Sequence, residues 1–100
     1  MRNYELMLIL DPEADEERLG SVMDRVRSSI GDHSGEVLSE DHWGRRKLAY
    51  KVGTFTEGNY HLAHLQMETE GTSALETNLK LNEDVIRHLL IREELIREDE

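Results

Sequence analysis

The chain has 100 residues, of which 12 are lysine or arginine and 22 are aspartate or glutamate, giving a formal net charge of −10 at pH 7. This length provides for one domain with one hydrophobic core. The chain contains no cysteine, which excludes a disulfide framework and a thiolate metal site. The acidic charge argues against non-specific binding to bulk RNA, because repulsion from the phosphates would oppose it.

The N-terminal segment is apolar only from Leu6 to Leu10, and Asp11-Pro12 ends the apolar run. A signal sequence needs roughly 7–15 apolar residues and a membrane span about 20. We therefore expect a soluble cytoplasmic protein, and the lack of cysteine fits a reducing compartment.

The first half of the chain predicts a strand followed by a helix. Within residues 3–10, odd and even positions are both apolar from Leu6 onward, which is typical of a central strand covered on both faces. Residues 15–30 predict a helix, because acidic residues stand at its start, where the helix dipole favours negative charge. Five apolar residues in this segment recur at helical spacing: Leu19, Val22, Met23, Val26 and Ile30.

A long β-hairpin is expected next. Residues 36–52 predict an extended strand, in which Gly44 indicates a bulge or bend. Residues 53–58 predict a loop and residues 59–67 a third strand, so the second and third strands should pair with each other.

The last two predicted elements are a helix and a strand. Thr72 is the expected N-cap of the helix, and Leu75 and Leu79 form an i, i+4 apolar pair on one of its faces. Residues 84–92 predict the final strand.

The order of elements predicts an α+β fold of the ferredoxin-like type, βαββαβ. Two right-handed crossovers would give a four-stranded antiparallel sheet with both helices on one face. We expect this domain to cover residues 1–92, and residues 93–100 to form an acidic, solvated C-terminal tail.

The segment from His42 to Thr56 has the opposite charge to the rest of the chain, with four basic residues and no acidic one. Segregated positive charge is typical of a surface that binds a polyanion. Because side chains alternate along a strand, Arg45 and Lys47 would share one face. The opposite face would place Leu48 and Val52 in the core. An edge strand protected from aggregation by its basic residues is the alternative interpretation.

Neither a metal site nor a catalytic site is predicted. His61 and His64 are three residues apart in a strand and should point to opposite faces, while His42 and His88 have no sequence-local partner at ligand spacing. The sequence also lacks a nucleophile motif and a glycine-rich phosphate loop. We expect no enzyme activity, no metal and no other cofactor.

Other protein classes share the predicted topology. An acylphosphatase would hold phosphate in the first strand–helix loop, but here residues 11–15 carry carboxylates that would repel it. An RNA-recognition motif stacks bases on aromatic residues of its first and third strands, and residues 57–64 do not match that pattern. A dimeric regulatory or small-molecule-binding ferredoxin-like domain remains the alternative function.

Several blocks of the sequence resemble the bacterial small-subunit ribosomal protein six family. They occur in the family's order and span residues 2–92. The blocks are Tyr4-Glu5-Leu6-Met7 running to Asp11-Pro12, the run from Trp43 to Val52, Gly58-Asn59-Tyr60, and the run from Leu79 to Leu89. The resemblance implies a structural protein of the bacterial small ribosomal subunit that acts in translation, without catalysis, a small-molecule substrate or a membrane.

The resemblance also implies the partners and the site. It implies binding to the central domain of small-subunit rRNA as a heterodimer with small-subunit ribosomal protein eighteen, whose basic charge would complement this acidic chain. Most of the implied RNA contacts would be made to phosphate and sugar, and these contacts position the protein. Specificity for the RNA would come from its shape. These RNA-binding residues are Arg2, Tyr4, Arg45, Arg46, Lys47, Arg87, His88 and Arg92.

Overall fold

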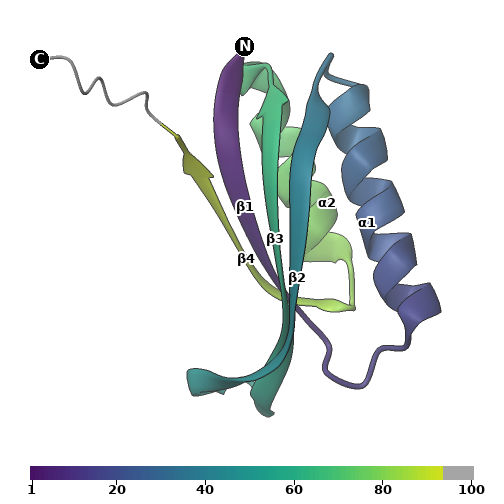
Figure 1. The fold of residues 1–100 in the computed structure, drawn as a ribbon, viewed down its shortest axis with the longest axis vertical. Coiled ribbons are helices and arrows are strands. Elements are labelled where there is room, and N and C mark those ends of the chain that lie inside the picture. Colours follow the sequence, from purple (N-terminus) through teal and green to yellow (C-terminus); the bar gives the residue numbers. More distant parts are fainter. Residues whose placement is uncertain (94–100) are drawn as a thin grey trace, which may run out of the picture.

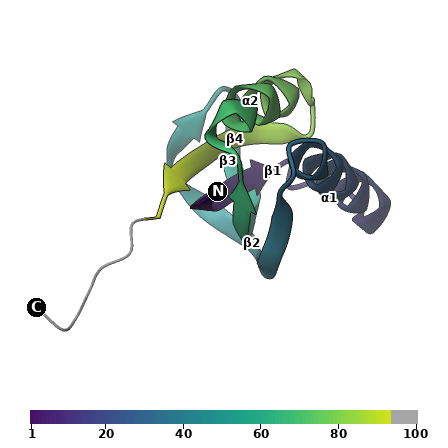
Figure 2. The same ribbon diagram turned by 90° about the horizontal axis from the view of Figure 1, so that it is seen from above.

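The computed structural model describes residues 1–93, and its strands and helices follow the predicted order βαββαβ (Figure 1). The elements are β1 (Arg2–Leu10), α1 (Glu16–Gly31), β2 (Glu36–Val52), β3 (Phe55–Met67), the short 3-10 helix η1 (Thr69–Gly71), α2 (Thr72–Leu81) and β4 (Val85–Arg92). The strands form one antiparallel four-stranded sheet in the order β2-β3-β1-β4. Both helices cover the same face of this sheet (Figure 2). The predicted ferredoxin-like fold is confirmed.

The predicted acidic tail falls almost entirely outside the described residues, which end at Glu93. The backbone N–H of Glu93 donates to the carbonyl oxygen of Asn3 at 2.8 Å, so the chain still runs beside β1 at this point. Within residues 1–93, no helix is both long enough and apolar enough to span a membrane.

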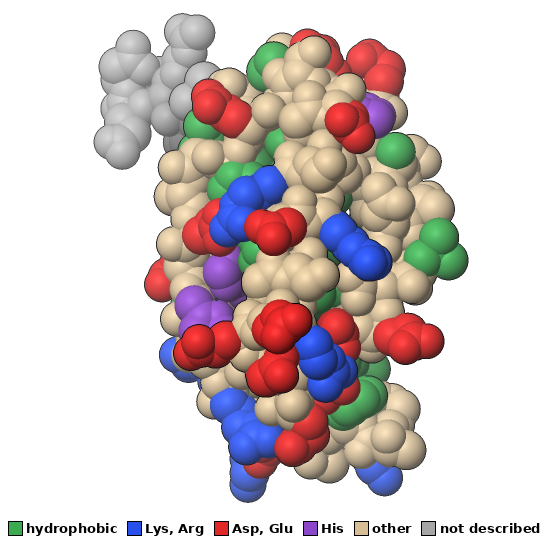
Figure 3. All heavy atoms as spheres, turned by 90° about the vertical axis from the view of Figure 1, so that its right-hand side faces the viewer, with side chains coloured by type: hydrophobic (Ala, Val, Ile, Leu, Met, Phe, Trp, Pro, Cys, Tyr) green, Lys and Arg blue, Asp and Glu red, His purple; other side chains and the backbone are tan. Residues whose placement is uncertain are grey.

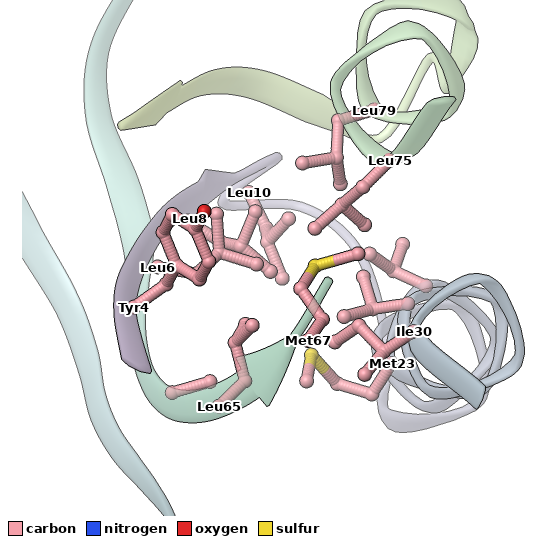
Figure 4. Close-up of a cluster of buried hydrophobic side chains, with 13 residues drawn as sticks. Tyr4, Leu6, Leu8, Leu10, Met23, Ile30, Leu65, Met67, Leu75 and Leu79 are labelled. Carbon is pink, nitrogen blue, oxygen red and sulfur yellow. The ribbon is translucent and has the colours of Figure 1, made fainter. Parts of the chain in front are cut away.

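Alternate residues of β1 form the centre of the hydrophobic core. Tyr4, Leu6, Leu8 and Leu10 are at most 5% exposed. They point from the sheet toward α1 and α2, where Met23, Ile30, Leu75 and Leu79 meet them (Figure 4). This packing is the two-layer arrangement expected when helices bury one face of a sheet.

The prediction that β1 is covered on both faces is wrong. Glu5, Met7 and Ile9 face away from the helices and are only half-buried. Met7 lies between Leu62 of β3 and Leu89 of β4, and these cross-strand neighbours shield part of its side chain. Met7 and Ile9 are therefore apolar without lying in a second core.

The N-terminus of α1 agrees with the sequence, whereas that of α2 does not. Asp15 caps α1, and its carboxylate accepts a hydrogen bond from the backbone N–H of Arg18 at 2.9 Å. Thr72 is not the N-cap of α2 but its first residue, and Gly71 takes the cap position. The 3-10 turn η1 has already begun to wind the chain, so the hydroxyl of Thr72 donates backward to the Thr69 carbonyl at 2.8 Å.

The β2–β3 hairpin is longer and tighter than predicted. Val52 pairs directly with Phe55, so β3 begins at Phe55 and not at residue 59. Gly53 has a φ of +60°, a conformation that allows a two-residue turn between the strands. The predicted irregularity at Gly44 is confirmed by its φ of +84° and by a register shift between His42 and Gly44.

Two glycines provide a matched test of the packing. A Cβ atom at Gly35 would lie 2.7 Å from Met67 Cβ and against the backbone carbonyl of Gln66, whereas at Gly20, inside α1, it would meet nothing within 4 Å. We expect Gly35→Ala to lower the free energy of unfolding by about 1–3 kcal/mol through overpacking. Gly20→Ala should raise it by up to about 1 kcal/mol, because alanine favours the helix. Urea unfolding measures both, and effects of the same sign would contradict this packing.

Candidate RNA-binding surface

The basic residues of β2 lie on a hairpin that projects beyond the rest of the sheet. The last residue of β1, Leu10, pairs with Asn59, and Arg45 pairs with the same residue from the other side. The parts of β2 and β3 beyond this level therefore pair only with each other, and they form the lower end of the molecule in Figure 1. The register places Arg45, Arg46, Lys47 and Lys51 on this two-stranded projection, named here the basic hairpin.

Arg46 completes a layered contact with two aromatic rings. The indole of Trp43 stacks on the ring of Tyr60, with centroids 6.3 Å apart and planes inclined by 6°. The guanidinium of Arg46 lies 5.3 Å from the Trp43 ring centroid, within the range of a cation–π contact. The indole N–H of Trp43 donates to Asp41 at 3.0 Å, which fixes the ring orientation. The stack positions Arg46 without neutralising its charge.

Arg45 has a different environment although it is the neighbour of Arg46. Its guanidinium lies 2.8 Å from the carboxylate of Glu13 and 3.1 Å from that of Glu57, and it also donates to the Pro12 carbonyl oxygen at 3.2 Å. Strand alternation turns Arg45 toward the loop between β1 and α1, whereas Arg46 faces the helix-free side of the sheet. Within residues 1–93, Arg46, Lys47 and Lys51 have no such carboxylate partner.

This difference predicts unequal effects on RNA binding. Arg45→Ala should reduce RNA affinity less than Arg46→Ala, because two carboxylates already compensate the Arg45 charge. The ion pairs of Arg45 are half-exposed, so their loss should cost less than about 1 kcal/mol of stability. Filter-binding titrations of the two single variants measure the difference. A larger loss for Arg45→Ala would show that Arg45 leaves its carboxylates to bind RNA.

Arg87 of β4 reaches across the helix-free face to β2. It pairs with Ile9 in the sheet register, and its guanidinium lies 5.6 Å from the Tyr50 ring centroid and hydrogen-bonds the Tyr50 hydroxyl. This contact closes one side of a hollow of about 270 Å³. The lining of the hollow is mostly apolar and comes from all four strands. Tyr50 and Arg87 belong to it together with Met7, Ile9, Leu48, Val52, Tyr60 and Leu89.

The prediction that Leu48 and Val52 reach the core is therefore wrong. Both side chains are half-buried and line this hollow on the helix-free face. The side chains of β2 alternate between the two faces of the sheet, and Leu48 and Val52 lie on the helix-free face, next to Met7 and Ile9 of β1. They therefore do not lie between the sheet and the helices.

Two of the predicted RNA contacts point into the molecule. Tyr4 is 5% exposed in the core, and its hydroxyl donates to the Thr69 hydroxyl oxygen at 3.3 Å. The His88 side chain is 12% exposed and contacts the Glu76 carboxylate at 3.2 Å under α2. Both residues belong to the strand parity that faces the helices. Tyr4 and His88 therefore present little surface to RNA in this fold.

The other predicted contacts lie in two separate places. Arg92 pairs with Tyr4 across the sheet, and Arg2 stands two residues before Tyr4, so both lie at the end of the sheet opposite the basic hairpin. Arg46, Lys47 and Arg87 lie at the hairpin end. On the α1 side of the molecule, acidic and basic side chains alternate, and basic ones reach its lower end (Figure 3). The hairpin end is therefore the candidate site.

The fold and this surface define a small ferredoxin-like domain that carries a cationic β-hairpin. The chain belongs to the ribosomal protein S6 family, which matches residues 3–92. It is 39% identical over 93 residues to small ribosomal subunit protein bS6 of Desulforamulus reducens, covering 93% of this chain and 98% of that protein. It is 44% identical over 92 residues to bS6 of Beutenbergia cavernae, covering 92% and 96%.

A solved structure supports the same assignment. The crystal structure of ribosomal protein S6 from Thermotoga maritima superimposes with a TM-score of 0.84 at 28% identity, covering 92% of this chain and 87% of that one. The family resemblance in the sequence is thereby confirmed.

Proposed function

We propose that this protein is a structural component of the bacterial small ribosomal subunit. In this proposal it binds the central domain of small-subunit rRNA, forms a heterodimer with ribosomal protein eighteen, and has no catalytic activity. Membership of the ribosomal protein S6 family and the names of the bS6 relatives support the assignment.

The observation that carries the RNA-binding part is the charge of Arg46, Lys47 and Lys51 on the basic hairpin. These three residues are exposed and follow closely along the projecting part of β2, in a chain whose net charge is −10. Cations on a projecting strand bind phosphates and release their counterions, which is the main source of affinity for RNA. These contacts are confined to the basic hairpin, so the acidic rest of the protein does not need to contact the RNA.

The overall charge supports a basic protein partner. A net charge of −10 limits the approach of this chain to RNA, and a basic partner would offset it. The helix-free face also exposes large apolar side chains near the hairpin, including Tyr50 at 62% and Leu89 at 55%. Exposed apolar residues grouped with charged ones are typical of a protein-binding surface.

Sedimentation equilibrium with purified protein eighteen tests the partner. The chain alone should sediment as a monomer at micromolar concentration and as a one-to-one heterodimer when protein eighteen is added. A stable homodimer that does not bind protein eighteen would contradict the proposed heterodimer and would favour the alternative function, a dimeric regulatory domain.

A further inference from the structure

A pair of histidines faces each other across the β2–β3 hairpin, away from the RNA-binding surface. His42 and His61 are directly opposite in the strand register. Their Nδ1 atoms are 3.4 Å apart, with ring centroids separated by 5.7 Å and planes inclined by 50°. The bulge between His42 and Gly44 follows this pair at once, and bulges of this kind redirect side chains. The structure thus brings two ligand atoms of the same kind together.

The separation of the two nitrogens suits a shared metal ion better than a hydrogen bond. Two imidazole nitrogens at about 2.0–2.1 Å from a tetrahedral Zn²⁺ lie about 3.3–3.4 Å from each other. A hydrogen bond between two ring nitrogens would normally be shorter, near 3 Å. The distance of 3.4 Å between His42 Nδ1 and His61 Nδ1 therefore matches that of two nitrogens bound to one metal ion.

The far side of the His61 ring has the support that metal-binding histidines usually have. His61 Nε2 lies 3.2 Å from a carboxylate oxygen of Glu40, and Arg27 donates to both Glu40 oxygens at 2.7–2.9 Å. A carboxylate at Nε2 holds the proton there and leaves the Nδ1 lone pair free to bind a metal. Arg27, Glu40 and His61 thus form a chain that ends at the ligand atom.

We propose that His42 and His61 bind a divalent transition-metal ion such as Zn²⁺ through their Nδ1 atoms. Glu40 and Arg27 orient His61, and water fills the remaining coordination positions. Imidazole pairs suit zinc, copper and nickel, so the ligand set defines this class of ion. The site does not depend on the proposed ribosomal role, since Arg46 and Trp43 project from the opposite face of β2.

A second group of potential ligands provides the internal control. Glu5, His64 and Glu93 lie on the helix-free face, with their ligand atoms within 4.8 Å of one another. In that group the Nδ1 atom of His64 itself contacts Glu93 at 2.8 Å, whereas the carboxylate partner of His61 lies at its Nε2 atom and leaves Nδ1 free. The replacement His64→Ala removes a histidine of the same hairpin and leaves the pair of His42 and His61 intact.

Isothermal titration of the full chain with Zn²⁺ alone tests the proposal, with circular dichroism as the check of folding. We expect one ion per chain, loss of that binding in His42→Ala, and unchanged binding in His64→Ala. Glu40→Gln should weaken the affinity by about tenfold or more, as changes behind a metal-binding histidine usually do. His42 is exposed, so its replacement should leave the fold intact.

Histidine-resolved NMR adds a readout that a structural role would not change. Zn²⁺ should shift the Nδ1 resonances of His42 and His61 and leave those of His64 in place. The proposal is overturned if the folded wild type binds no Zn²⁺, if His42→Ala binds it equally well, or if His64→Ala abolishes the binding.

Discussion

Leu8→Ala is expected to lower the free energy of unfolding by about 2–5 kcal/mol. Leu8 is fully buried at 0% exposure, and it lies in the central strand β1, where both helices cover it (Figure 4). Replacing it removes apolar contacts and leaves a cavity in the hydrophobic core of a small domain, whose whole stability is about 5–15 kcal/mol. Urea unfolding with a common slope measures the change.

Leu89→Ala is the matched control for this variant. Leu89 is 55% exposed on the helix-free face and pairs with Met7 in the same sheet. The same chemical change should cost less than about 1 kcal/mol there, because little apolar surface is lost from contact. Equal losses for the two variants would contradict the assignment of the core to one face of β1.

The second large effect concerns RNA binding by the basic hairpin. The double variant Arg46→Ala/Lys47→Ala should weaken binding to the central-domain rRNA fragment in the presence of protein eighteen. Each cation that contacts a phosphate contributes about one to the slope of log K against log salt, so the slope should fall by roughly two. Both residues are exposed, and thermal stability should stay within about 0.5 kcal/mol.

A charge-matched variant separates local contact from overall charge. Arg25 and Lys80 are exposed on α1 and α2, so Arg25→Ala/Lys80→Ala gives the same net charge as the hairpin variant. This control should retain most of the affinity and most of the salt slope. If both double variants lose affinity equally, the net charge determines binding and the hairpin has no special role.

The sequence determines the fold well because its strongest patterns are local. The helical spacing in residues 19–30 and the breaks at Asp11-Pro12 and Gly53 place the elements, and βαββαβ order leaves few topologies. The apolar pattern does not separate buried from half-buried strand residues, since cross-strand neighbours shield Met7 and Ile9 without a second core. For the same reason Leu48 and Val52 could not be assigned to the correct face.

The candidate site was harder to predict because it depends on pairing between strands. Family resemblance marks positions along the chain, but it does not say which face a side chain occupies, and Tyr4 and His88 face the helices. The stack of Trp43 on Tyr60 depends on the bulge itself, because Trp43 lies between His42, which pairs with His61, and Gly44, which pairs with Tyr60. A bulge shifts every later pair by one residue, so its exact place must be known first.

The two histidines opposite each other were missed for the same reason. His42 and His61 are 19 residues apart in the sequence, and neither has a ligand at local metal spacing. Only the register of the hairpin brings them together. Counting back from the two-residue turn at Gly53 would have been the available signal, but the irregularities between Lys47 and Val52 and between His42 and Gly44 change that count.

A titration of a central-domain rRNA fragment with this protein, with and without protein eighteen and at two salt concentrations, tests the central claim most directly. Tight binding only with the partner, weakening as salt rises, is the predicted result, because several phosphate contacts from an acidic chain need a basic partner. The absence of binding with the partner present, at both salt concentrations, would contradict the assignment of this chain as an rRNA-binding component.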